Sequence, residues 1–365
     1  MKVQDITSLL EKMAPPFLQE SYDNAGLITG NGNWVCTGII TSLDVTEAVV
    51  QEAVEKKCNL IVAHHPIIFK GLKKITGKNY VEQTVIAAIK NDIAIYAIHT
   101  NLDHVLQGVN GKIADILGLI NRRVLQPKGS LLKKLFTFVP VAHAEKVRNA
   151  IFAAGGGQIS NYSECSFNSE GLGTFKAGKD TDPFVGQIGA RHTEPEIKIE
   201  VIFAAWAEGA VSNALLAAHP YEEVAYDIIS LDNTSIQLGA GLIGELPEPV
   251  SETSFLTHIK EKFNLSVIKH TGLLDKPVQK VALCGGAGSF LIGAAIAAGA
   301  DFYISSDIKY HEFFDANNRL VLADIGHYES EQFTIDLLFD ILREKFPTFA
   351  VLKTEVKTNP VLYFL

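Results

Sequence analysis

The sequence predicts an α/β protein whose two-part core has mostly parallel sheets and is interrupted by an inserted ferredoxin-like domain. Short apolar runs alternate with amphipathic segments in the first and the last third of the chain. This alternation is typical of parallel strands joined by crossover helices. The middle third has a strand–helix repeat of its own between glycine-containing seams, which indicates the insert.

The first third opens with charged and apolar residues at helical spacing and then alternates strands with helices. The apolar runs predict strands at 34–43, 59–63 and 93–98. The amphipathic segments predict helices at 46–56, 80–91 and 109–117.

The last third repeats this style. Strands are expected at 280–284, 302–304 and 320–325, and helices at 253–263, 290–300, 307–316 and 333–346. The glycine-rich turn at 285–289 resembles an anion-cradling loop. It lacks the Lys-Ser/Thr of a P-loop, so close helix–sheet packing is the favoured interpretation.

The middle third predicts two β-α-β units separated by a glycine-rich, irregular stretch at 171–189. Strands are expected at 135–141, 163–168, 196–204 and 222–229, and helices at 144–154 and 207–218. This order is that of a ferredoxin-like domain. We therefore expect the N-terminal half of the core at 1–128, the insert at 129–236 and the C-terminal half of the core at 237–365.

Composition excludes several classes of function. The chain of 365 residues carries a net charge of −9 and has no cluster of basic residues, which disfavours a nucleic-acid partner. Its four cysteines occur singly, so neither a disulfide scaffold nor a zinc ribbon is indicated. The N-terminus is not a signal peptide, and the longest apolar stretch is too short to span a membrane. A cytoplasmic protein with no membrane partner is expected.

The strongest candidate site begins with two adjacent histidines, His64 and His65, which close a buried strand just before Pro66. Proline ends the strand, so neighbouring side chains can converge there. Open α/β sheets bind ligands at the carboxyl ends of their strands. The alternative for the pair alone is two hydrogen-bonded core histidines.

Two further strands end in groups of the same kind. The strand at 93–98 leads into His99 and Asp103, and the strand at 320–325 leads into His327 and Glu331, which are four residues apart. Glu331 alone would normally be a solvated residue at a helix start. Three such strand ends together favour a site for a divalent ion such as Zn, Fe, Mn or Co.

The motifs that carry a family resemblance run along the whole chain: 22–26 (YDNAG), 43–44 (LD), 63–66 (AHHP), 99–103 (HTNLD), 285–288 (GGAG), 306–311 (SDIKYH) and 326–331 (GHYESE). By these motifs the chain resembles the Nif-three-like family of dinuclear-metal hexameric proteins, often labelled GTP cyclohydrolase I type 2 homologs. The middle module, with its motif at 219–223 (HPYEE), resembles the insert of the longer bacterial members. That insert is similar in fold to nitrogen-regulatory signalling proteins and copper-tolerance proteins.

The resemblance implies two divalent ions per subunit, Zn, Fe or Mn, held by His64, His65, Asp103, His327 and Glu331. It also implies a toroidal homohexamer. Five protein ligands would leave open coordination positions on both ions, as in catalytic rather than structural sites.

Two functions are expected from this site. The first is a metal-dependent hydrolase of the cyclohydrolase type, acting on a small nucleotide-like or heterocyclic substrate. The alternative is a metal-binding regulatory or metal-trafficking hexamer without turnover. His99, Asp307 and His311 are candidates to support the ligands or face the substrate, although His311 could equally be exposed on a helix. His104 is expected at the surface.

Overall fold

The computed structural model describes residues 1–159, 161–235 and 237–364. The chain divides into two compact units. One comprises Met1–Pro127 together with Ile236–Leu365, and the other comprises Lys128–Ser235. Residue 236, the last of the expected insert, lies outside the described residues. Each unit has a hydrophobic core of its own.

The first unit contains a five-stranded sheet whose two faces are both buried. Its strands, in spatial order, are β1 (Gly26–Thr29), β4 (Ala94–Ala97), β3 (Leu60–Ala63), β2 (Ile39–Ser42) and β15 (Val351–Lys353). The helices around it are α1 (Val3–Met13), α2 (Glu47–Glu55), α3 (Tyr80–Lys90) and α11 (Thr334–Lys345), with a short 3-10 turn, η1 (Pro16–Leu18). Leu60 and Val62 pack in the core with α1 and α11, whereas Ile61 packs with α2 and α3. A strand buried on both faces is an unbroken apolar run, as the sequence shows.

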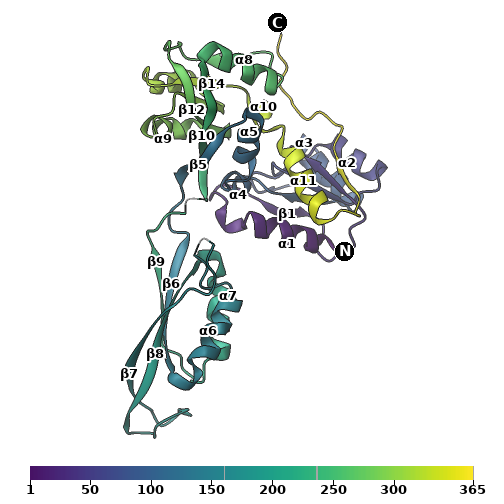
Figure 1. Cartoon of the computed structure of the whole chain (residues 1–365). Helices are drawn as coiled ribbons and strands as arrows, with labels where there is room; N and C mark the ends of the chain where they lie inside the picture. Colours follow the sequence, from purple (N-terminus) through teal and green to yellow (C-terminus); the bar gives the residue numbers. More distant parts are fainter. Residues whose placement is uncertain (160, 236, 365) are drawn as a thin grey trace. The chain divides into compact units, whose positions relative to one another are not determined.

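A six-stranded sheet completes the first unit. Its strands, in spatial order, are β11 (Lys269–His270), β14 (Val321–Asp324), β13 (Phe302–Ser306), β12 (Pro277–Ala287), β10 (Gly239–Ser251) and β5 (Ile120–Pro127). Its helices are α5 (Val109–Leu117), α8 (Glu252–Lys262), α9 (Ile292–Ala297), η4 (Ser289–Leu291) and η5 (Tyr310–Ala316). Leu283 of this sheet and Leu60 of the other belong to one continuous core, which joins the two sheets. In Figure 1, the labels β10, β12 and β14 mark the six-stranded sheet, and the label β1 marks the five-stranded sheet.

Both sheets are mixed. The five-stranded sheet is mostly parallel, as expected, whereas the six-stranded sheet has more antiparallel than parallel pairings, which corrects the expectation there. In the first, β1 runs antiparallel to β4, and in the second, β5, β10 and β11 are antiparallel to their neighbours. β5 and β10 run antiparallel to each other because of the path that the chain takes between them. The second unit is inserted between β5 and β10, and the last residue of β5, Pro127, pairs with the first residue of β10, Gly239. Strands joined in this way lie antiparallel.

The second unit is a four-stranded antiparallel sheet with two helices. The spatial order is β7 (Phe167–Lys176), β8 (Arg191–Ala204), β6 (Leu132–Pro140) and β9 (Tyr226–Leu231). The helices are α6 (Ala144–Ala153) and α7 (Glu208–Ala218), each preceded by a 3-10 turn, η2 (Val141–His143) and η3 (Ala205–Ala207). Val147 and Leu215 pack the helices against Ile199 and Val201 of β8. The other face of the sheet is free of helices among the described residues (Figure 1).

Several expected elements differ from the structure, and one of them is the strand expected at 163–168, which begins only at Phe167. The stretch expected to be irregular from 171 is strand β7 as far as Lys176, because pairing with β8 overrides the weak strand propensity of its glycines. The apolar helix expected at 290–300 is helical only over Ile292–Ala297 and follows a 3-10 turn. The helix expected from Asp307 begins at Tyr310, because Asp307 has a left-handed φ of 56° that no helix accommodates.

Candidate metal centre

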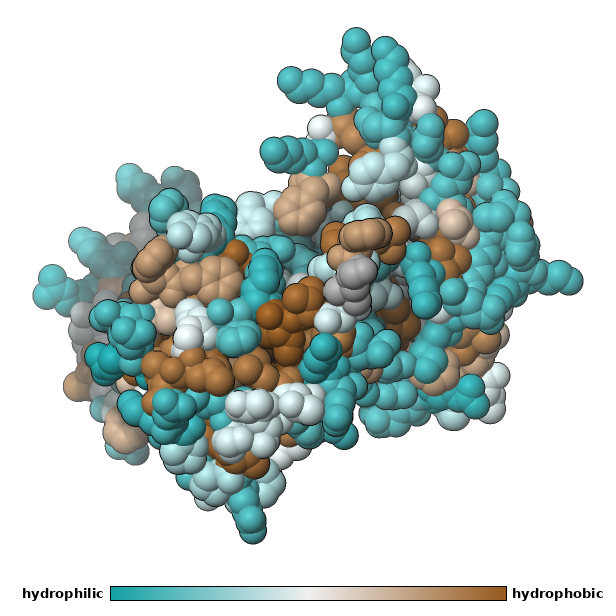
Figure 2. Space-filling model, turned by 90° about the horizontal axis from the view of Figure 1, so that it is seen from above, coloured by the Kyte–Doolittle hydropathy of each residue, from teal (hydrophilic) through white to brown (hydrophobic). Residues whose placement is uncertain are grey.

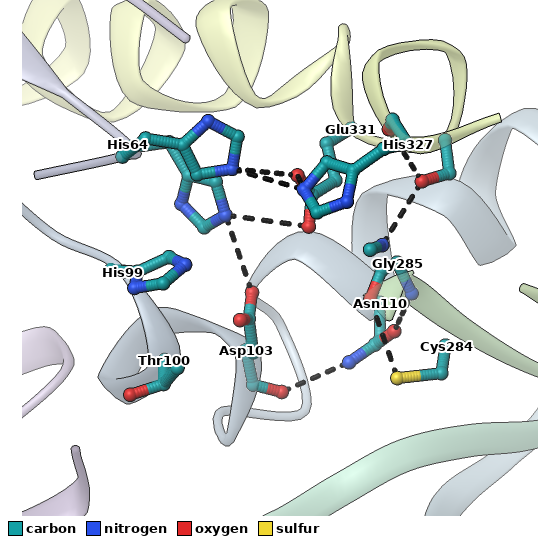
Figure 3. Close-up of polar contacts among 12 residues, drawn as sticks. His64, His99, Thr100, Asp103, Asn110, Cys284, Gly285, His327 and Glu331 are labelled. Atoms are coloured by element: carbon teal, nitrogen blue, oxygen red, sulfur yellow. Dashed lines mark hydrogen bonds and ion pairs between the residues drawn. The ribbon is translucent and has the colours of Figure 1, made fainter. Parts of the chain in front are cut away.

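Four of the five predicted metal ligands, His65, Asp103, His327 and Glu331, line one cavity of about 1490 Å³ in the first unit, and the fully buried His64 lies beside Asp103 and Glu331. His64 and His65 follow β3 directly, and Asp103 ends α4 (Thr100–Asp103), the single turn after β4. His327 and Glu331 begin and end α10 (His327–Glu331), which follows β14. The carboxyl ends of strands from both sheets therefore face this cavity. Figure 3 shows His64, Asp103, His327 and Glu331 turned toward one another.

Glu331 lies at the middle of the cluster and is almost fully buried, with 3% of its surface exposed. Its Oε2 lies 2.9 Å from His65 Nε2 and 3.1 Å from His327 Nε2. Its Oε1 lies 3.6 Å from His64 Nε2, which is also 3.6 Å from Asp103 Oδ1. Each oxygen of this carboxylate thus faces a different group of ligands.

Two such groups have the compactness that a metal ion requires. The ligand atoms of His65, His327 and Glu331 lie within 4.8 Å of one another, and so do those of His64, Asp103 and Glu331. His64, His65 and His99 form a third group of this kind. Imidazole and carboxylate together suit Zn, Fe and Mn. The structure therefore holds His/carboxylate groups that could bind a metal.

The outer nitrogen of each central imidazole is held by an oxygen. His64 Nδ1 donates to the Ile98 carbonyl (2.9 Å), His65 Nδ1 to Asp44 (2.7 Å) and His327 Nδ1 to Asp307 (2.6 Å). A proton fixed on Nδ1 leaves the lone pair of Nε2 directed at the centre, which is how metal-binding histidines are usually oriented. The left-handed backbone at Asp307 places its carboxylate in this role.

Two atoms of the cluster have no hydrogen-bond partner in the described part of the chain, although both are buried. They are His64 Nε2 and Asp103 Oδ1. A buried polar atom without a partner costs free energy, and an ion between these two atoms would remove that cost. The donor set therefore fits a divalent cation.

The electrostatics of the cluster favour bound protons when no metal is present. Burial lowers the pKa of His65, but hydrogen bonds to Asp44 and Glu331 outweigh it and raise the pKa to about 10. In the same way, Glu331 and Asp307 raise the pKa of His327 to about 9 against the effect of burial. Burial and the neighbouring Glu331 raise the pKa of Asp103. Burial opposes the ionisation of Glu331, but hydrogen bonds from the histidines hold its pKa below the usual value.

The glycine-rich segment expected as a turn at 285–289 is strand as far as Ala287, and this end of β12 packs against the cluster. The Gly285 amide donates to Asn110 Oδ1 and the Gly286 amide donates to Ser330 Oγ, so these two amides have partners within the protein. A Cβ added at Gly286 would lie 2.5 Å from Glu331 Oε1. Position 286 is therefore a glycine because the backbone passes directly beside the side chain of Glu331 on α10. This agrees with the expectation that these glycines allow close helix–sheet packing.

The remaining candidate histidines have different positions. His99 lines the cavity, and its Nδ1 is bonded to Asp23 at 2.8 Å. His311 is exposed on η5, where its ring stacks on Phe314, and the cavity is lined by other residues. His104, expected at the surface, is buried, because its Nδ1 bonds the Thr100 carbonyl. That expectation was wrong.

Sequence reasoning assigned no role to three residues that orient the site, although Asp23 and Asp44 lie in the motifs at 22–26 and 43–44. Asp44 holds His65, Asp23 holds His99, and Thr358 donates to Asp44 Oδ2 at 2.8 Å. Asp44 could have been found, because it follows an apolar strand in the same way as the ligands. Thr358 lies in an irregular C-terminal segment, and no pattern in the sequence associates it with residue 44.

The fold and the cluster define a class of protein: a mixed α/β protein with a His/carboxylate cluster that could bind metal at the ends of its strands. The chain belongs to the DUF34/NIF3 (NGG1p interacting factor 3) family, whose sequence profile matches residues 1–360.

Full-length relatives agree with this membership. The chain is 39% identical to a Halalkalibacterium halodurans protein named GTP cyclohydrolase 1 type 2 homolog, over 99% of this chain and 98% of the relative. A Bacillus subtilis protein of the same name is 39% identical over 89% of this chain and 88% of its own length. A crystal structure of a Bacillus cereus protein related to NIF3 superposes with a TM-score of 0.84, at 39% identity, covering 100% of this chain and 99% of that one.

Across residues 1–159, 161–235 and 237–364, the structure has no helix that is long and apolar enough to cross a membrane.

Proposed function

We propose that the protein is a dinuclear metal hydrolase that acts on a small nucleotide-like or heterocyclic substrate. Its two divalent ions, Zn, Fe or Mn, would be held by His64, His65, Asp103, His327 and Glu331. The observation that carries the proposal is the convergence of three imidazole Nε2 atoms on the one buried carboxylate of Glu331.

Glu331 is the one residue that both groups of ligands share, so it would contribute to holding either ion. Its Oε1 faces His64 and Asp103, and its Oε2 faces His65 and His327. Each ion would have only three protein ligands, one of which is Glu331 in both cases. Positions would therefore remain open for water or substrate, as in catalytic sites.

Bound divalent ions would lower the pKa of a water molecule and stabilise the negative charge that develops during hydrolysis. The chain itself contributes orientation. Asp44 and Asp307 hold His65 and His327 in place. Asp23 holds His99 in the same way, and the His99 side chain lines the cavity, where it could exchange a proton with a bound molecule. His99 is our candidate for moving a proton to or from the substrate.

The walls of the cavity favour a flat, aromatic substrate. Four of the aromatic side chains that line it are 48–66% exposed: Tyr22, Phe69, Tyr80 and Phe290. Phe69 also packs edge-on against His99, with ring centroids 5.6 Å apart. Exposed rings next to the candidate reaction centre provide stacking surfaces for a heterocycle.

Metal analysis of the purified protein tests the ligand set. We expect two divalent ions per chain in the wild type and an almost complete loss in the His64→Ala/Glu331→Ala double variant. His311→Ala is the matched control, because it also removes an imidazole but lies outside the cavity. Full metal occupancy in the double variant, with its fold verified by circular dichroism, would refute the ligand set.

A substrate screen with the metal found in this way separates hydrolysis from metal handling. GTP is the first probe, because relatives carry the name GTP cyclohydrolase 1 type 2 homolog. Turnover that depends on metal and on Asp103 supports the hydrolase. Ready exchange of the ions without turnover on a wide panel of heterocycles would instead support a metal-binding regulatory or trafficking protein.

We further propose that residues 128–235 are a ferredoxin-like insert and that the chain assembles as a homohexamer in the cytoplasm. The strand order β7-β8-β6-β9 with two helices supports the insert. Exposed apolar side chains support assembly: Tyr310 and Phe314 of the first unit are 74% and 68% exposed. Figure 2 shows brown, apolar patches between polar ones on one face of the molecule. Closed oligomers bury such patches.

A further inference from the structure

The second unit contains a cavity of its own, which the metal centre does not use. It has a volume of about 650 Å³ and is lined by β7, by residues of β8 and by the turn at 221–223. Residues alternate across β8: Ile199 and Val201 enter the core under the helices, so Glu196 and Lys198 lie on the opposite face. The cavity therefore stands on the helix-free face of the sheet and has the size of a small-molecule site.

A buried carboxylate lies in its wall. Glu196 is only 8% exposed, and its Oε1 accepts a hydrogen bond of 2.9 Å from the hydroxyl group of Tyr221. Its Oε2 accepts no hydrogen bond from any described residue. A Cβ at Gly173 would lie 2.1 Å from that oxygen, so this glycine leaves room for the carboxylate. One oxygen is thus held in place, and the other is left for a donor in the cavity.

Aromatic rings surround this carboxylate. Tyr221 lies with its ring centroid 6.1 Å from that of Phe175 and 6.2 Å from that of Phe184, and Phe138 completes the wall. The faces of aromatic rings attract cations, and a carboxylate beside them adds a full negative charge. Burial and the neighbouring Glu196 raise the pKa of Tyr221, which keeps its hydroxyl group as a donor.

The charges around the cavity also favour a cation. Its lining contains four acidic residues, Glu170, Glu196, Glu222 and Glu223, and two basic ones, Lys176 and Lys198. The ammonium group of Lys198 is already bound to Glu200 at 2.7 Å. The excess of negative charge disfavours phosphates and other anions.

We propose that this cavity binds a small organic cation, with its ammonium group on Glu196 and its apolar body between the aromatic rings. The ligand class is a primary amine that carries a ring or an alkyl chain. Gly171 marks the free space, because a Cβ there would meet no atom within 4 Å. A large side chain at this position would fill the cavity without straining the backbone.

Calorimetric titration of the full-length protein with tryptamine tests the proposal. Indole-3-propionate and tryptophol are the matched probes, because they replace the ammonium group with a carboxylate and a hydroxyl group. We expect tryptamine to bind at least about tenfold more tightly than either, the size of effect expected for a charged hydrogen bond. Equal affinity for the three, or no saturable binding of tryptamine in the low millimolar range, would overturn the proposal.

Three variants locate the binding. Glu196→Gln keeps the shape of the side chain and should weaken tryptamine binding at least about tenfold. Gly171→Leu should abolish binding by filling the cavity, and it keeps the test valid if Glu196→Gln does not fold. Glu145→Gln makes the same charge change at an exposed position of α6 and should have no effect. Unchanged affinity in folded Glu196→Gln or Gly171→Leu would refute the site.

Discussion

At the scale of single residues, the candidate site depends on groups that would not bind a metal themselves. Asp44, Asp307 and the Ile98 carbonyl each hold the outer nitrogen of a central histidine. Gly286 leaves the space that the carboxylate of Glu331 occupies. These residues set the direction of each ligand atom, so changes in them should alter metal binding while every ligand remains present.

Gly286→Ala tests the close approach of the backbone to Glu331. The new Cβ would lie 2.5 Å from Glu331 Oε1, so the carboxylate must move and metal content should fall. Gly118→Ala is the control, because Gly118 also has a left-handed φ but has no atom within 4 Å of an added Cβ. Both variants should lose about 1–2 kcal/mol of unfolding free energy, and only Gly286→Ala should lose metal. Equal metal content in the two would contradict the prediction.

The histidine pKa values predict that metal binding releases protons. Without metal, His65 and His327 have pKa values raised to about 10 and about 9, so both carry a proton at pH 7.5. An ion needs their neutral form, so its binding should displace about two protons at pH 7.5 and should strengthen as the pH rises to about 10. Titration calorimetry in buffers of different ionisation enthalpy counts these protons. Binding without proton release at pH 7.5 would be the contrary result.

The same pKa values set the sign of a stability effect in the metal-free protein. A histidine whose pKa is higher in the folded than in the unfolded state stabilises the fold below the unfolded pKa of about 6.5. This stabilisation is lost as the pH rises through the folded values of about 9 and about 10. The melting temperature of the chelated protein should therefore fall between pH 6.5 and 10.

At the scale of elements, the ends of strands from two sheets supply the ligands, and a segment after the last strand secures them. This segment, residues 354–364, follows β15 and lines the cavity with Thr358, Asn359 and Tyr363. The Asn359 amide group donates to Glu329 Oε1 at 3.0 Å. The C-terminal segment thus contacts both the β2 end and α10, and we infer that it stabilises the arrangement of the ligands.

Thr358→Val tests this role of the C-terminal segment. The variant keeps the shape of the side chain but removes the hydroxyl group that donates to Asp44 Oδ2. Asp44 should then hold His65 less firmly, and a chelator should extract the metal faster, by up to about tenfold. Thr358→Ser keeps the hydroxyl group and should behave like the wild type. Equal release rates for Thr358→Val and the wild type would show that the segment has no influence on the site.

At the scale of the whole molecule, the chain consists of two units with separate cores and separate cavities. The metal ligands all belong to the first unit. The strands that flank the second unit, β5 and β10, are neighbours in one sheet, and Pro127 pairs with Gly239. The first unit can therefore be closed without the second by a short hairpin loop.

Removal of residues 128–235 tests the independence of the first unit. We expect a soluble protein that keeps two ions per chain, because β5 and β10 remain paired and no ligand is removed. If the first unit provides the contacts between subunits, light scattering should report a hexamer for both the full chain and the shortened one. A full chain that is monomeric or dimeric would refute the ring, and loss of metal on shortening would make the second unit integral to the site.

The sequence by itself determined the positions of most strands and helices and the residue types at the strand ends. Apolar runs as short as 59–63 and 93–98 favour buried strands. The histidines and carboxylates that follow them mark the points where these strands end. The sequence therefore located His64, His65, Asp103, His327 and Glu331 as one candidate set, with help from the family resemblance.

Only the tertiary structure decided how these residues meet. The partners of the ligands lie far from them in sequence, as Thr358 lies from Asp44, and such contacts leave no periodic pattern along the chain. Pairing with β8 made a strand of the glycine-rich β7, and the chain path made both sheets mixed. Local propensity costs about 1 kcal/mol or less per residue, so long-range pairing and packing overrule it. The directions of the ligand atoms follow from that packing.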